Sequence, residues 1–156
     1  MMLARVGMIA AAILAVATVA WAQKPDFSGT WTLDPASAPA AGGGGGEGGA
    51  LGNGPATIKQ TADALTIERT MGDAKVTLTS KLDGTESRNM LMGRGGQPAD
   101  TLATAKWDGR KLTILTKQEM DGQLSEFTQV WTVDGGTLTV ETTNARGTQK
   151  RVYKKS

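Results

Sequence analysis

The sequence predicts an all-β protein, an antiparallel up-and-down meander closed into a β-barrel of about ten strands. Short segments in which apolar residues alternate with Thr or charged residues recur from residue 27 onward, and this period of two is typical of strands. Asp-Gly pairs begin at residues 83, 108, 121 and 134, and such pairs favour tight hairpin turns. We therefore expect each strand to pair with the next one.

The first expected strand is residues 27–33, where Phe27, Gly29, Trp31 and Leu33 share one face and hydroxyl side chains share the other. The other expected strands are residues 55–61, 64–70, 74–82, 85–92, 100–107, 110–118, 123–133, 136–143 and 147–154. An open meander would leave two exposed edges, and closure into a barrel removes both. An eight-stranded barrel stays an alternative, with little or no helix in either case.

Residues 1–22 have the features of a secretory signal peptide. One basic residue, Arg5, precedes an Ala-rich apolar run, and Ala20-Trp21-Ala22 ends it with small residues at the cleavage positions. We expect cleavage after Ala22 and a secreted or periplasmic protein. A membrane anchor is the alternative, but the run is short and weakly apolar for a spanning helix, so no stable membrane insertion is expected after cleavage.

Residues 23–156 are expected to form one domain, with residues 34–54 as a flexible Pro/Ala/Gly-rich loop within it. Nine of the thirteen residues from 42 to 54 are Gly, a composition that buries little apolar surface on folding. A phosphate-binding loop is not favoured, because the GxxxxGK[ST] pattern and a following helix are both lacking.

The composition excludes several classes of function. Without residues 1–22 the chain carries 16 basic and 15 acidic side chains, which gives no basic stripe for nucleic acid. His and Cys are absent, so the commonest general base, thiol nucleophile and transition-metal ligands are missing. We expect no catalytic residue, no metal, no cofactor and no enzymatic activity. A membrane-spanning barrel is disfavoured by the scarcity of aromatic residues for its girdles.

The chain resembles the calycins, and within them the lipocalin and fatty-acid-binding-protein-like barrels. The resemblance rests on the first strand, Phe27-Ser28-Gly29-Thr30-Trp31-Thr32-Leu33, and on the closing segments. These run from Lys106-Trp107-Asp108-Gly109 through Val133-Asp134-Gly135 to Arg151-Val152-Tyr153-Lys154-Lys155. It covers residues 27–33 and about 74–155.

The resemblance implies that Trp31, with Gly29, closes one end of the barrel beneath a basic side chain of the last strand. It also implies that Arg151 and Tyr153 hold the carboxylate of a bound ligand, in agreement with the bidentate chemistry of a guanidinium. The chain departs from the family in two ways. The Gly-rich run replaces two short helices, and the family's second inward arginine would fall near Val130, which is apolar.

Alternation alone does not decide which face of the last strand points inward. Arg151 and Tyr153 share one face and Val152 lies on the other. Three alternatives stay open: a carboxylate site at Arg151 and Tyr153, a structural role in which Arg151 covers Trp31 by a cation–π contact, and a solvated tail.

A barrel of this strand number is wide enough to enclose one small ligand. The expected ligand-binding residues, besides Arg151 and Tyr153, are Ala103, Ala105, Trp107, Ile114, Phe127 and Trp131. The sequence thus predicts an exported, monomeric, lipocalin-like protein that binds a small hydrophobic ligand, with a fatty acid or other amphipathic carboxylate as the favoured class. The alternative is a non-catalytic structural or interaction module of the cell envelope with a filled barrel.

Overall fold

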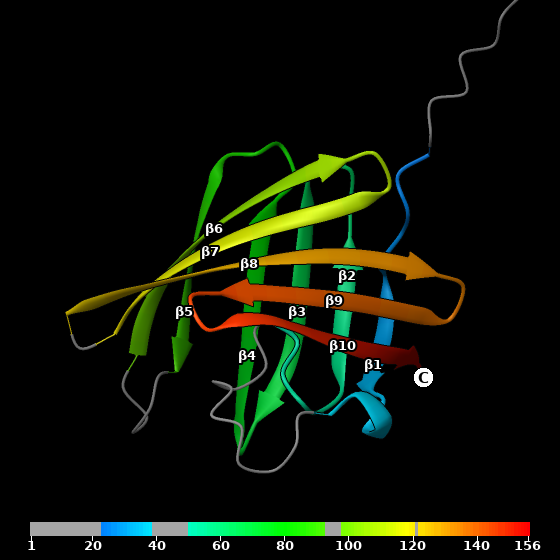
Figure 1. Ribbon diagram of the computed structural model, residues 1–156, viewed down its shortest axis with the longest axis horizontal. Coiled ribbons are helices and arrows are strands. Elements are labelled where there is room, and N and C mark those ends of the chain that lie inside the picture. Colours follow the sequence, from blue (N-terminus) through cyan, green and yellow to red (C-terminus); the bar gives the residue numbers. More distant parts are fainter. Residues whose placement is uncertain (1–22, 39–49, 93–97, 121) are drawn as a thin grey trace, which may run out of the picture.

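The computed structural model describes residues 23–38, 50–92, 98–120 and 122–156 (Figure 1). The expected signal peptide and most of the Gly-rich loop, residues 39–49, lie outside the described residues. The strands are β1 (Gly29–Leu33), β2 (Ala56–Gln60), β3 (Ala64–Met71), β4 (Ala74–Lys81), β5 (Glu86–Met92), β6 (Pro98–Asp108), β7 (Lys111–Met120), β8 (Gln123–Asp134), β9 (Thr137–Asn144) and β10 (Gly147–Lys155). A single 3-10 turn, η1 (Pro35–Ser37), follows β1, and Asp34 caps it by accepting a hydrogen bond from the Ala36 amide.

The predicted ten-stranded antiparallel barrel is confirmed in the described part of the chain, and the eight-stranded alternative is wrong. Each expected strand boundary falls within two residues of the observed one. The last strand pairs with the first, with Trp31 opposite Lys155 and Leu33 opposite Tyr153. In Figure 1, β7 to β10 cross in front of β1 to β4, so that the strands enclose a common interior.

The expectation that each strand pairs with the next is wrong at one place, between β4 and β5. These strands are the two ends of the sheet order, and no backbone ladder joins them. Side chains bridge them instead: Asn89 accepts a hydrogen bond from the Thr79 amide at 2.8 Å and donates one to the Thr79 carbonyl at 2.9 Å. The Ser87 hydroxyl accepts from the Lys81 amide at 2.8 Å. This β4–β5 seam leaves the barrel nearly closed.

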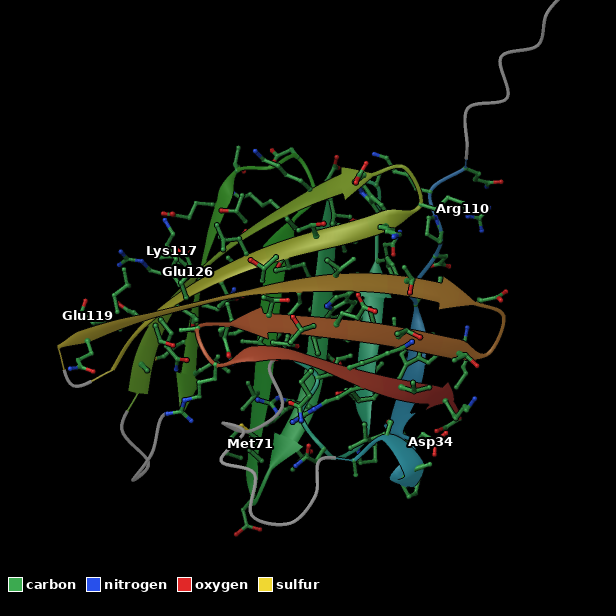
Figure 2. The ribbon with its side chains drawn as sticks, in the orientation of Figure 1. Asp34, Met71, Arg110, Lys117, Glu119 and Glu126 are labelled. Atoms are coloured by element: carbon green, nitrogen blue, oxygen red, sulfur yellow. The ribbon has the colours of Figure 1, made fainter. Side chains whose placement is uncertain are left out.

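The core lies inside the barrel, and the charged residues of the described chain lie on its outer surface except for Arg69 and Arg151, which are buried. Trp31, Leu65, Leu112, Trp131 and Leu138 have no exposed area. Figure 2 shows Lys117 and Glu126 side by side on the outside of β7 and β8, where their charged atoms are 4.0 Å apart. None of the helical segments in the described ranges is long and apolar enough to cross a membrane.

Candidate functional site

One end of the barrel is closed by aromatic side chains. The Trp31 indole nitrogen donates a hydrogen bond to the Phe27 carbonyl at 2.8 Å. The Phe27 ring stacks on Trp107 and meets Trp131 edge-on, in both cases with ring centroids 5.8 Å apart. These four residues define the aromatic end. Arg110, in the turn between β6 and β7, marks its side of the molecule in Figure 2.

Lys155 is the basic side chain that covers Trp31, with its Nζ 5.5 Å from the ring centroid. The contact requires glycine at position 29, because a Cβ there would lie 2.5 Å from Lys155 Cε. The backbone φ of +139° at this position also favours glycine. The alternative in which Arg151 covers Trp31 is therefore wrong. The Gly-x-Trp sequence of β1 is explained by the path of the Lys155 stem across Gly29.

Arg151 and Tyr153 point into the barrel, with 4% and 1% of their areas exposed. Val152 lies on the other face of β10, where it is partly exposed. The last strand is held on both sides, by β9 and by β1, so the solvated-tail alternative is also wrong.

The polar atoms of Arg151 and Tyr153 meet neutral oxygens in the described part of the chain. The Tyr153 hydroxyl donates to the Gly52 carbonyl at 2.9 Å. Arg151 donates from Nη1 to Asn53 Oδ1 at 3.1 Å and from Nη2 to Gln149 Oε1 at 3.5 Å. Burial raises the pKa of Tyr153, and its interactions with Arg151 and the charge of Arg69 partly oppose that rise.

Arg69, on β3, is the residue that the sequence interpretation missed. Its side chain is 9% exposed, and its guanidinium lies so close to Gly52 that a Cβ there would collide with it. The family's second inward arginine was expected near Val130, but that residue is on the outer face of β8, between the buried Gln129 and Trp131. The signal was present in the sequence, because Leu65, Ile67 and Arg69 alternate along one face of a strand.

Residues 50–53, which we call the inner segment, press into the barrel beside these side chains. Leu51 is 1% exposed, and Ala50 packs against the core. Arg69, Arg151 and Tyr153 together with the inner segment define the arginine end. Met71, at the end of β3, marks that side of the molecule in Figure 2.

A cavity of about 30 Å³ remains inside the barrel. Its apolar lining includes three of the expected ligand-binding residues: Ala103, Ile114 and Phe127. Ala50, Ile67, Leu78 and Leu91 complete the apolar lining, and Ser80, Asn89, Thr101 and Thr116 supply polar atoms. The volume holds a water molecule or two, far less than the several hundred Å³ of an ordinary ligand pocket.

The other expected ligand-binding residues lie elsewhere. Ala105 and Trp131 have no exposed area and belong to the packed core, and Arg151 and Tyr153 meet the inner segment. Trp107 packs on Phe27 and borders a separate cleft of about 260 Å³ at the surface, together with Lys24, Asp26, Gln60, Thr61, Ala62 and Leu82. In the described ranges, no group of three or more acidic, His or Cys residues is placed to hold a metal ion.

The solved structures that are similar to this chain include the following three. A single-residue mutant of the fluorescent protein UnaG is 21% identical with a TM-score of 0.55, and the match covers 83% of this chain and 96% of that one. Human cRBP IV is 21% identical with a TM-score of 0.55, covering 85% and 99%. A fatty acid transporter, REP1-NXSQ, is 16% identical with a TM-score of 0.53, covering 83% and 95%.

Comparison by sequence adds no closer relationship. No family model matches the chain, and no curated protein matches it. At these identities the similar structures show the fold, which agrees with the strand order and the near-closed barrel. The chain shares the fold of these structures, a nearly closed antiparallel barrel of ten strands, as the resemblance to the calycins implied.

Proposed function

We propose that the protein is an exported, non-catalytic carrier of a small amphipathic carboxylate, whose head group binds at Arg151 and Tyr153. The observation that carries the proposal is the burial of Arg151, 4% exposed, against the neutral oxygens of Asn53 and Gln149. Among the described residues no carboxylate forms an ion pair with this guanidinium, and a buried charge without a counter-charge is costly. A carboxylate would supply that charge and accept the charge-assisted hydrogen bonds of the guanidinium.

Two further observations support the proposal. One of the similar structures is a fatty acid transporter, and another is cRBP IV, a cellular retinol-binding protein, so the same fold holds hydrophobic ligands elsewhere. The signal-peptide pattern of residues 1–22 supports export. Secretion, a periplasmic location and a monomeric state are parts of the same proposal.

The test is displacement of a fluorescent long-chain fatty acid from the purified protein. Arg151→Met keeps the length of the apolar stem and removes the charge. A hydrogen bond to a charged group contributes about 1.5–3 kcal/mol, so we expect the dissociation constant to rise about 10- to 150-fold. Arg110→Met is the matched control, since it makes the same charge change at an exposed position of the β6–β7 turn.

The control should bind the fatty acid as tightly as the unchanged protein does. The unchanged protein should bind the corresponding fatty alcohol more weakly than the acid, whereas Arg151→Met should not distinguish the two. Equal affinities of the unchanged protein and Arg151→Met for the acid would contradict the proposed head-group site.

A second function is favoured by the small interior volume. With about 30 Å³ of free space, the barrel could serve as a filled structural or interaction module of the cell envelope. Mass spectrometry of an organic extract from protein recovered from its native compartment separates the two. A stoichiometric lipid acid supports the carrier, whereas an empty extract with no displacement of the fluorescent fatty acid supports the module.

A further inference from the structure

We infer that the inner segment, residues 50–53, is a built-in occupant of the carboxylate site, which a ligand must displace in order to bind. The inference rests on the proposed function, because it assigns Arg151 and Tyr153 to the ligand head group. The small cavity is then the space that is free while the inner segment occupies the site. A ligand that displaces the segment receives more space.

The burial of the segment is the first step. Connections between strands normally run over the surface, but here Leu51 is 1% exposed and Ala50 lines the interior cavity. Gly52 is buried against Arg69 and Tyr153, with a φ of +68°. Position 52 requires glycine for two reasons. The positive φ disfavours a side chain, and a Cβ would collide with the Arg69 guanidinium.

The hydrogen bonds are the second step. The segment presents two oxygens, the Gly52 carbonyl and Asn53 Oδ1, to the Tyr153 hydroxyl and to Arg151 respectively. A carboxylate likewise presents two oxygens, and adds the negative charge that the segment lacks. The segment is thus a neutral stand-in for a carboxylate head group. Because Asn53 is exposed, its contact can exchange with solvent.

The groups that leave the site with the inner segment indicate the class of ligand that can replace them. A head group at Arg151 and Tyr153 takes the places of the two oxygens, and the apolar body beside it takes the places of Leu51 and Ala50. The vacated space joins the existing cavity, whose lining includes Ile67, Leu78 and Phe127. The site therefore suits a carboxylate attached directly to an apolar body. The apparent affinity for the ligand is the intrinsic affinity multiplied by the fraction of molecules in which the inner segment has left the site.

Substitutions at Asn53 test whether the inner segment competes with the ligand, because one of them weakens and the other strengthens the contact of the segment with Arg151. Asn53→Ala removes the acceptor from Arg151, so the fluorescent fatty acid should bind several-fold more tightly. Asn53→Asp turns the neutral stand-in into a charged one, so binding should weaken at least about 10-fold. Asn144→Asp, at the exposed last residue of β9, makes the same change at a residue outside the inner segment and should leave binding unchanged.

A single thiol reports the position of the segment without any ligand. The chain contains no Cys, so Leu51→Cys introduces one thiol at a buried position, and its rate of alkylation measures how often the segment leaves. Combined with Leu51→Cys, Asn53→Asp should slow alkylation, and Asn53→Ala and added fatty acid should each accelerate it. Amide hydrogen exchange at residues 51–53 makes the same comparison with Leu51 in place.

The outcomes separate the inference from the proposed function. Alkylation and exchange that are equal with Asn, Asp and Ala at position 53 overturn the inference, even if the fatty acid binds. A second outcome is that the alkylation and exchange rates depend on the residue at position 53 but no variant binds the fatty acid. It would support self-occupancy and overturn only the proposed carboxylate carrier. Fatty-acid binding that leaves Leu51→Cys as slowly alkylated as before overturns the displacement.

Discussion

The two ends of the barrel are closed by different physics. At the aromatic end, Phe27, Trp31 and Trp131 are completely buried against one another and against apolar neighbours. At the arginine end, the closing groups are two guanidiniums, a phenol and a short piece of chain that offers neutral oxygens. Apolar packing has no equivalent replacement in solvent, whereas a neutral hydrogen-bond acceptor is readily exchanged for a better one. The aromatic end therefore maintains the fold, and the arginine end is the exchangeable one.

The largest expected effect is on stability, at the aromatic end. Trp31→Ala should lower the free energy of unfolding by about 3–5 kcal/mol, the usual cost of removing a buried tryptophan. Urea denaturation followed by the fluorescence of the remaining tryptophans measures it. A loss below about 1 kcal/mol would show that the aromatic end is not the stabilising one.

The intermediate effect is at the arginine end and depends on pH. Tyr153→Phe removes the hydrogen bond to Gly52 and should cost about 1 kcal/mol at neutral pH. Burial raises the pKa of Tyr153 above its ordinary 10.0, so above pH 10 the unfolded chain releases the proton first. The contribution of the phenol is present below pH 10 and is lost as the pH rises through the folded-state pKa.

The measurement is urea denaturation of both proteins from neutral to alkaline pH. The difference between the unchanged protein and Tyr153→Phe should shrink above pH 10. Because Tyr153 is the only tyrosine of the chain, phenolate absorbance titrates it directly. A phenol that ionises below its ordinary range would contradict the buried, neutral hydroxyl.

The smallest expected effect is that of the Lys155 contact with Trp31. Lys155→Met keeps an unbranched apolar stem across Gly29 and removes the charge, so about 0.5–1 kcal/mol of cation–π stabilisation is lost. Lys154→Met, on the exposed outer side of β10, is the matched control. A larger loss than for Tyr153→Phe would contradict the expected order of these two effects.

The strands could be predicted from the sequence because alternation and the Asp-Gly turns are local signals. The face of β10 could not, because Lys150 and Lys154 on one side balance Arg151 and Lys155 on the other, and burial depends on the neighbouring strands. Arg69 could have been found by extending the face of Leu65 and Ile67.

The inner segment gives no comparable local signal. Ala50-Leu51-Gly52-Asn53 lies within a Gly-rich stretch that is typical of surface loops. It is buried through contacts with Arg151 and Tyr153, which are about a hundred residues further along the chain. The β4–β5 seam is equally non-local, since it depends on where the closing sheet leaves its two edges.

The seam also has a consequence for the connectivity of the barrel. Apart from β1 with β10, every backbone ladder in the described chain joins strands that are neighbours in sequence. The first and last strands of the barrel are adjacent, since the Ser156 amide donates a hydrogen bond to the Thr30 carbonyl at 2.9 Å. A circular permutant of the barrel, cut in the Asp83–Gly84 turn and with β10 joined to β1, would start at β5 and end at β4. All of its ladders would then be between sequential strands, so the permutant should fold faster.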